Sequence, residues 1–452
     1  YGYKVVTSRE NMKGILELFQ LVDRYIHKLV ALHEVFPYQM TMAAVVAHKS
    51  AEKHKKFLDE NAEKIEEDEE KTAYKLDSKY FGRSSRLGRR SDRAKTVLDL
   101  LPRNFVVSYV SEYDSFLGQL ITQILKFKPE IVDSKDKSIS LSDLVNLGSV
   151  EAARDKIFAK EVESILRSSH ADQFCWMEKA FSIPLTKGLN SWPLFIELTE
   201  RRNLFVHCDG VVSEQYLNVC KRHNVSVGSD TIVGNRLQAE KKYLRQAYEV
   251  LYEIGIKLSQ VLWRKLSPDD IEKAESSLSH FTYELLIEEN YKLAKNLLDF
   301  SCCTLKKWGA EGTRLVYVVN RALAYKFSGD HDKCISILDD EDWSACGDNY
   351  NLCVAVLREE FDLAKTLMLR IGASGSVSEI DYIEWPCFKD FRSTDQFIDA
   401  FTEVFGKAPT TIEQVDNDEF ESQSDNNVEE REGEEKSEEV DDSVELEAEN
   451  KA

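Results

Sequence analysis

The chain lacks several features that mark common classes of enzyme and secreted protein. Its nine cysteines include no CxxC pair, and their number is odd. This scatter argues against a disulfide framework and against a zinc site, and it favours a reducing cytoplasm as the location. No GxxxxGK, HExxH or GxSxG motif is present, so neither a nucleotide-binding P-loop, a metalloprotease site nor a serine-hydrolase site is indicated. We therefore expect no metal and no cofactor.

Proline and long uninterrupted apolar runs are also scarce. Only 8 prolines occur in 452 residues, while 42% of the residues are hydrophobic, a composition that favours an all-α fold with a sizeable core. The most apolar early run, residues 29–47, is interrupted by His33, Glu34, Pro37 and Gln39. No charged-then-apolar secretion signal opens the sequence, so we expect no membrane association.

Negative charge is concentrated at one end. The net charge is −21, and residues 412–452 contribute 18 acidic and 3 basic side chains, or −15, which leaves −6 for the first 411 residues. A nearly balanced body with local basic clusters need not repel RNA. We expect the acidic, low-complexity stretch 409–452 to be a disordered tail.

The first hundred residues combine helical and strongly charged segments. Apolar residues at three- and four-residue steps predict a helix over 9–36, a second helical piece after Pro37, and a charged helix or connector over 52–75. The stretch GRSSRLGRRSDRAK, residues 82–95, is expected to form a basic loop. It fits a surface linker and an RNA phosphate-binding segment about equally well, through Arg83, Arg86, Arg89 and Arg90.

Residues 103–127 give the clearest helical pattern, and further helices are expected within 141–168 and over 234–265. After Pro268, the segments NYKLAKNLL, DHDKCISIL and EFDLAKTLM place small residues at equivalent points, namely Ala294, Cys334 and Ala364. The region resembles a degenerate tetratricopeptide array. Such arrays usually bind proteins, so a regulatory partner is expected here.

The segment RRNLFVHCDG, residues 201–210, carries the candidate chemistry. A helix is expected to start near Ser191 and Pro193 and to end at about Cys208, with Gly210 as the left-handed residue. Asn203 and His207 would share one face, so that Asn203 could orient the imidazole. Arg202 beside them offers a planar fork for a phosphate.

This set of residues suits RNA cleavage without a metal. The ribose 2′-hydroxyl attacks the neighbouring phosphorus, and the reaction needs a general base, a general acid and a positive charge. One protomer offers one histidine in the motif. Two protomers around a two-fold axis would supply two, so a homodimer or a higher oligomer is expected.

The segment RNLFVH matches the RNxxxH motif of the HEPN superfamily, which this chain resembles over roughly residues 100–266. SYVSEYDSFLGQLITQIL looks like its opening helix, WPLFIELTERRNLFVHCDGVV like its motif helix, and KKYLRQAYEVLYEIGIKLSQVLWRKL like its closing helix. The resemblance implies a dimeric, metal-independent endoribonuclease. Arg202 and His207 would be its catalytic pair and Asn203 the supporting residue. Arg201 is the alternative RNA-binding arginine.

Many HEPN relatives are toxins or effectors of antiviral, abortive-infection systems, and the resemblance implies such a role here. We expect a helical extension at 1–96, a HEPN-like ribonuclease domain at 97–266, repeats at 267–408 and the acidic tail at 409–452. Glu112 and Asp114 are further residues that could face the cleft. The alternative is a non-catalytic dimerisation module with a repeat scaffold that binds protein partners.

Overall fold

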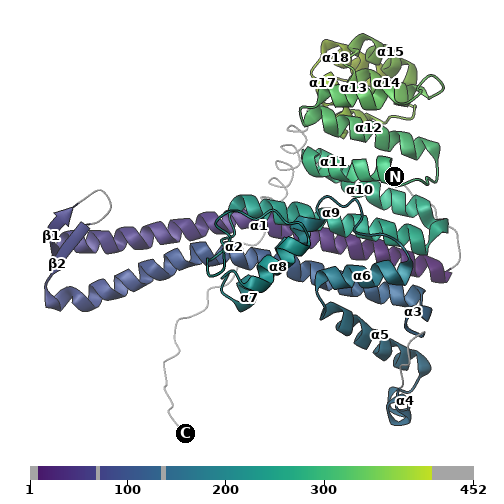
Figure 1. The fold of residues 1–452 in the computed structure, drawn as a ribbon. Helices are drawn as coiled ribbons and strands as arrows, with labels where there is room; N and C mark the ends of the chain where they lie inside the picture. Colours follow the sequence, from purple (N-terminus) through teal and green to yellow (C-terminus); the bar gives the residue numbers. More distant parts are fainter. Residues whose placement is uncertain (1–8, 68–71, 134–138, 410–452) are drawn as a thin grey trace, which may run out of the picture. The chain divides into compact units, whose positions relative to one another are not determined.

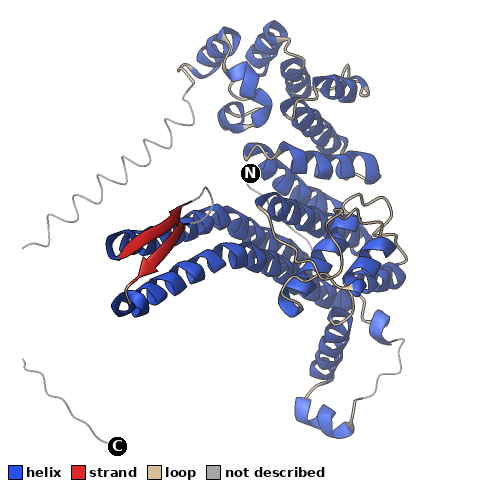
Figure 2. Ribbon diagram, turned by 60° about the vertical axis from the view of Figure 1, so that its left-hand side comes forward, coloured by secondary structure: helices blue, strands red, loops and turns tan. Residues whose placement is uncertain are grey.

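The computed structural model describes residues 9–67, 72–133 and 139–409, and this part of the chain is helical apart from one small β-hairpin (Figures 1 and 2). The all-α class is confirmed. The elements are α1 (Arg9–Asn61), β1 (Ala62–Glu67), β2 (Thr72–Leu76), α2 (Ser78–Phe127), α3 (Glu130–Asp133), α4 (Leu141–Leu147), α5 (Val150–Leu166), α6 (His170–Phe181), α7 (Trp192–His207), α8 (Glu214–Arg222), α9 (Lys241–Leu266), α10 (Ile271–Ile287), α11 (Tyr291–Asp299), α12 (Glu311–Phe327), α13 (His331–Asp339), α14 (Asp348–Leu357), α15 (Phe361–Ile371), α16 (Glu379–Glu384), α17 (Lys389–Arg392) and α18 (Asp395–Phe405).

The chain divides into two compact units. The first holds the residues up to Thr282 together with Asp299–Ala310, and the second holds Tyr283–Leu298 and the residues from Glu311 onward. The expected boundary between residues 96 and 97 falls inside α2. The predicted acidic tail lies, from residue 410 onward, outside the described residues.

The first unit is built on a long antiparallel hairpin of α1 and α2, whose outer part we call the arm (Figure 1). Phe36 of α1 packs on Phe105 of α2 with ring centroids 5.0 Å apart, and nearer the tip His54 contacts the Ser84 hydroxyl at 3.1 Å. Strands β1 and β2 pair antiparallel and close the end of the arm (Figure 2). The sequence did not predict these strands, because their residues are dense in Lys and Glu.

Pro37 lies inside α1, so the predicted helix break there is wrong. A proline removes one backbone hydrogen bond and usually ends or kinks a helix. Here Pro37 faces solvent, which can hydrate the carbonyl that loses its partner, and the Thr41 hydroxyl donates to the Pro37 carbonyl at 2.9 Å. Packing of Phe36 against α2 outweighs the tendency of Pro37 to end the helix.

The basic segment 82–95 is part of α2 and not a loop, which corrects the second local prediction. Arginine and leucine favour helices, and the two glycines cost only about 1 kcal/mol each. Gly88 also allows α1 to come close, because a Cβ there would lie 3.1 Å from the His54 ring. The helix begins at Asp77, whose carboxylate accepts from the Lys79 amide at 3.1 Å.

Helices α5, α7 and α9 pack around the inner half of the hairpin, and α6 packs against α5 and α7. The core is aromatic: Tyr25 of α1 stacks on Phe116 of α2 at 4.3 Å, and Tyr113 meets Phe195 of α7 edge-on at 5.1 Å. The buried Tyr25 hydroxyl donates to the Leu251 carbonyl of α9 at 2.9 Å. Tyr25 thus satisfies its polar atom while its ring joins three helices.

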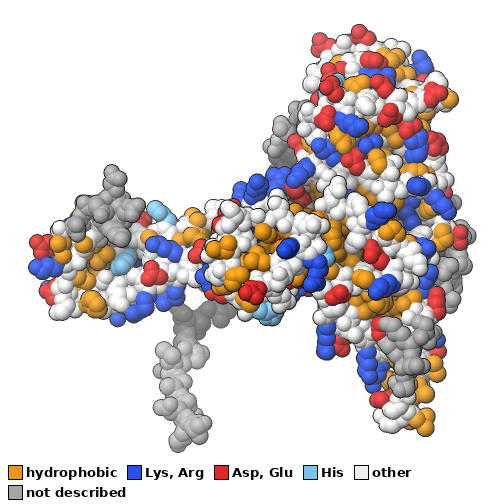
Figure 3. All heavy atoms as spheres, viewed as in Figure 1, with side chains coloured by type: hydrophobic (Ala, Val, Ile, Leu, Met, Phe, Trp, Pro, Cys, Tyr) orange, Lys and Arg blue, Asp and Glu red, His pale blue; other side chains and the backbone are white. Residues whose placement is uncertain are grey.

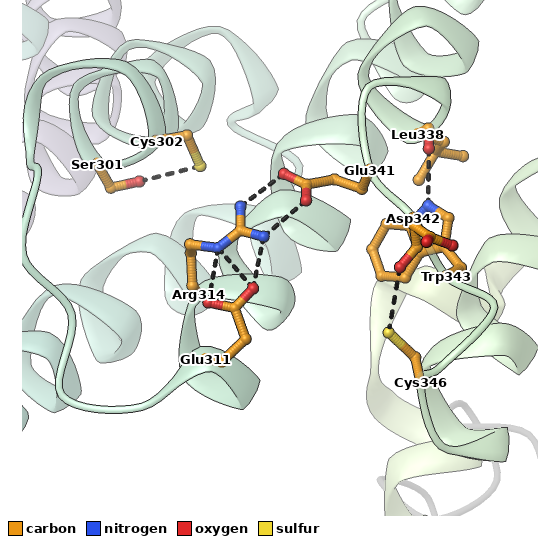
Figure 4. A network of polar contacts seen from close by, with 9 residues as sticks. All are labelled: Ser301, Cys302, Glu311, Arg314, Leu338, Glu341, Asp342, Trp343 and Cys346. Carbon is orange, nitrogen blue, oxygen red and sulfur yellow. Dashed lines mark hydrogen bonds and ion pairs between the residues drawn. The ribbon is translucent and has the colours of Figure 1, made fainter.

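The second unit consists of helix pairs with a repeat-like architecture. Ala294, Cys334 and Ala364, on α11, α13 and α15, are all fully buried, which confirms their equivalence. Burial raises the pKa of the Cys334 thiol to about 11, so it packs as a small apolar group. Figure 4 shows Arg314 of α12 between Glu311 and Glu341. Its Nη2 lies 2.7 Å from Oε1 of Glu311, and its Nη1 lies 2.5 Å from Oε1 of Glu341. The buried small residues allow the helices to pack closely, and Arg314 joins α12 to the segment after α13.

One helix of the described residues is long and apolar enough to cross a bilayer, by length and composition alone. A window within Leu18–Asn61 of α1 has a mean hydropathy of 1.3, so His33 and Glu34 do not lower it as far as expected. Core helices of water-soluble proteins and signal sequences meet the same criterion. This segment pairs with α2, but only 11% of the window is buried.

Candidate functional site

Helix α7 carries the predicted site residues and ends at His207. Pro193 lies in its first turn as predicted, although Ser191 makes no side-chain cap. Phe195, Ile196 and Leu198 are buried and anchor the helix. Gly210 has a φ of 79°, as predicted, but Asp209 directly before it, with a φ of 51°, is the first left-handed residue after the helix.

The turn after His207 is held by two arginines that the sequence did not point to. Buried Arg103 of α2 donates to the Asp209 carboxylate at 3.0 Å and to its carbonyl at 3.2 Å. Arg236 donates to the same carbonyl at 2.9 Å and also pairs with the carboxylate. These contacts fix the end of α7, and with it the backbone position of His207.

Arg202 points from α7 toward α2 and belongs to a group of three residues that we call the Asp114 cluster. Its Nη2 lies 2.7 Å from Oδ2 of Asp114, and Nε2 of His170, at the start of α6, lies 2.7 Å from Oδ1 of the same carboxylate. His170 is buried, while the side chains of Arg202 and Asp114 are 20% and 32% exposed. The guanidinium is therefore positioned but still reachable from solvent.

Asp114 was one of two acidic residues expected to face the cleft, and it does contact Arg202. The other, Glu112, instead pairs with Lys28 of α1 at 2.8 Å. His170 was missed, and no local signal could have found it, because its partner Asp114 lies 56 residues away in the chain. Only the packing of α6 beside α2 brings the two together.

Arg201 lies in a different set of contacts, which we call the Glu197 network. Its Nε lies 2.6 Å from the Glu197 carboxylate, and its guanidinium covers the Tyr243 ring at 4.0 Å. The hydroxyls of Tyr216 and Tyr243 donate to Glu197 at 2.6 and 2.8 Å. Arg201 thus fastens α7 to α8 and α9, which leaves Arg202 as the arginine beside the open surface.

Asn203 does not orient His207, contrary to the prediction. Its side chain lies near Glu200, one turn earlier on α7, where it acts to lower the pKa of that carboxyl. Burial raises the pKa of the Glu200 carboxyl, and the nearby His170 and Arg202 act against this rise. His207 is exposed and makes no hydrogen bond within the described part of the chain, so its imidazole remains accessible.

The four arginines expected to bind RNA lie on the arm. Arg83, Arg86, Arg89 and Arg90 are exposed, and Figure 3 shows basic side chains along the edge of the arm where α2 runs. Arg83 covers the Phe57 ring at 5.1 Å, and Arg89 donates to the Ser85 hydroxyl at 2.7 Å. About 36 Å of helix separates Arg90 from Asp114 at 1.5 Å per residue, so one protomer does not gather these arginines at α7.

The described residues contain no group of three or more His, Cys, Asp or Glu side chains that could hold a metal ion. Comparisons of the chain with protein-family models, with curated proteins and with solved structures give no match. The site must therefore be interpreted from its own geometry.

Proposed function

We propose that the protein is a metal-independent endoribonuclease whose catalytic pair is Arg202 and His207. The observation that carries this proposal is the placement of the two side chains on α7. Arg202 is held at 2.7 Å by a partly exposed carboxylate, and His207 ends the same helix with an open imidazole. Asn203 lies near Glu200 on the same helix, and no hydrogen bond joins it to the imidazole among the described residues.

The chemistry follows from these groups. One imidazole takes the proton of the ribose 2′-hydroxyl, the oxygen attacks phosphorus, and a protonated imidazole gives its proton to the departing 5′-oxygen. The products are a 2′,3′-cyclic phosphate and a 5′-hydroxyl. Arg202 balances the charge of the phosphorane through Nη1, which makes no hydrogen bond to the described residues.

A second protomer completes the site in this proposal. Arg202 and His207 are five residues apart on a helix, so their side chains leave the axis about 140° apart. One copy therefore presents its arginine and its imidazole in different directions. Two copies related by a two-fold axis would place the arginine of each near the imidazole of the other.

The test is cleavage of a defined RNA in EDTA, with the product ends mapped. We expect His207→Ala and Arg202→Ala to lower the rate 10²-fold or more. His48→Ala, which removes another exposed histidine on α1, is the matched control and should retain activity. Equal cleavage by His207→Ala, or no cleavage by the parent protein at high concentration, would contradict the proposal.

A toxin or antiviral effector role fits a nuclease that is joined to a repeat unit. In this proposal α11–α18 bind a regulatory protein, and the chain works in the cytoplasm. Ion pairs and fully buried small residues make the repeat helices rigid enough to present a surface.

A non-catalytic scaffold is the second candidate, and an exposed apolar stripe on α1 favours it. Val35, Tyr38, Met42 and Val45 follow three- and four-residue steps, and Tyr38 and Met42 are 73% and 66% exposed. This spacing is typical of a helix that pairs with another helix. Met42→Glu should then lower the mass measured by light scattering, whereas His207→Ala should leave it unchanged.

A further inference from the structure

Helix α2 presents one exposed line of side chains from the arm to the Asp114 cluster. Its members follow each other at steps of three or four residues, which keeps them on one face of the helix. All are exposed except the half-buried Ser108, and none is acidic. From the arm inward they are Arg83, Arg86, Arg90, Arg93, Val97, Leu100, Asn104, Ser108, Ser111 and Ser115.

The outer part of this line carries positive charge that no described residue neutralises. Arg86, Arg90 and Arg93 form no ion pair with any described residue. The acidic residues of the same stretch, Asp92 and Asp99, leave the helix about 120–140° away from the line. An exposed helix face with several unpaired arginines is suited to bind the phosphates of a nucleic acid.

The inner part of the line is polar and uncharged and leads to the candidate site. Ser111 and Ser115 flank Asp114, which holds Arg202. Between the two parts, Val97 and Leu100 are each 44% exposed. The bases of a single strand have open apolar faces that can contact such side chains, whereas a duplex hides them inside its stack.

We propose that this face of α2 is a track for single-stranded RNA that leads the strand to Arg202 and His207. The inference rests on the proposed nuclease function and specifies its substrate as RNA with a long unpaired flank on one side of the cleaved bond. Asp114 is about 32 Å from Arg93 and about 46 Å from Arg83 along the helix. At roughly 3.4 Å per phosphate in a stacked strand, the flank spans about 9 to 14 nucleotides, and fewer if it is extended.

The experiment measures RNA binding in full-length protein carrying His207→Ala, so that no substrate is cleaved. The track variant adds Arg86→Gln, Arg90→Gln and Arg93→Gln. The control adds Lys49→Gln, Lys53→Gln and Lys55→Gln, which removes the same charge from exposed positions on α1 of the same arm. Fluorescence anisotropy with labelled RNAs of 4 and 24 nucleotides reports the affinities, and circular dichroism checks that all proteins remain helical.

We expect the track variant to bind the 24-nucleotide RNA about tenfold or more weakly, with a salt slope lower by about two, and to bind the 4-nucleotide RNA as before. The affinity of the control variant for the same RNA should change by less than threefold. Equal losses in both variants, or no loss in the track variant, would overturn the proposal. So would the same loss of affinity for a 24-base-pair duplex RNA.

Failure of the track and failure of the nuclease can be told apart. If the parent protein binds the long RNA through the track but does not cleave it, the track proposal stands and the nuclease proposal fails. If the parent protein cleaves short and long RNAs equally and the three arginine substitutions have no effect, the nuclease proposal stands and the track proposal fails.

Discussion

The two sides of α7 use the same kinds of residue in opposite ways. On the inner side, Glu197 and Arg201 have side chains only 4% and 16% exposed, and two tyrosine hydroxyls complete the contacts of the carboxylate. On the outer side, Asp114 and Arg202 pair at nearly the same distance but are 32% and 20% exposed. The inner pair is closed to solvent, whereas the outer pair leaves its arginine partly open to solvent. Adjacent arginines therefore differ in role because of what surrounds them.

The largest expected effect tests the inner side. Glu197→Ala leaves Arg201 and two tyrosine hydroxyls without their acceptor in a buried site. Removing one partner of a buried pair costs about 3–5 kcal/mol, so the free energy of unfolding should fall by that amount in urea denaturation. Glu197→Gln keeps an acceptor, so its free energy of unfolding should fall by less. Equal losses for both variants would show that the charge of Glu197, and not the shape of its side chain, holds α7 in place.

The next effect concerns one hydrogen bond of the same network. Tyr216→Phe removes the hydroxyl that donates to Glu197 at 2.6 Å, and a bond to a charged group is worth about 1.5–3 kcal/mol. Tyr113→Phe is the matched control, because the buried Tyr113 hydroxyl has no hydrogen-bond partner among the described residues. Its stability should stay the same or rise. A larger loss for Tyr113→Phe than for Tyr216→Phe would contradict this reading of the network.

On the outer side we expect a small change in stability and a larger one in activity. Asp114→Asn weakens a partly exposed ion pair and should cost at most about 1 kcal/mol. Arg202 then loses its fixed position, and RNA cleavage should fall about tenfold with little change in melting temperature. The rate of RNA cleavage should fall further in Asp114→Ala. A loss of stability as large as that of Glu197→Ala would show that the outer pair is also structural.

The smallest expected effect is a dependence on pH at Glu200. Burial raises the pKa of this carboxyl in the folded protein, so folding favours its protonated form. This contribution to stability is present below the ordinary glutamate pKa and is lost as the pH rises through the higher folded value. Glu200→Gln should therefore stabilise the protein more at pH 7 than at pH 4, as measured by thermal melting. The opposite order would mean that His170 and Arg202 outweigh burial.

Patterns within a few helical turns were enough to predict much of the fold. The apolar periodicity of residues 103–127 lies within α2, and Gly210 has the positive φ that was predicted after the motif helix. The equivalence of Ala294, Cys334 and Ala364 also follows from the sequence, because each lies at the same point of an amphipathic helix. Such features depend on neighbours three or four residues away.

Long-range packing decided the rest. Helix α1 continues through Pro37, and residues 82–95 are helical, because each helix of the arm supports the other. Arg201 and Arg202 are indistinguishable by local pattern, and only the fold assigns one to Glu197 and the other to Asp114, 88 residues away in the chain. The sequence by itself determined the helices and the candidate motif, since these rest on local periodicity. The tertiary structure alone decided which charged groups meet, since that depends on contacts between distant helices.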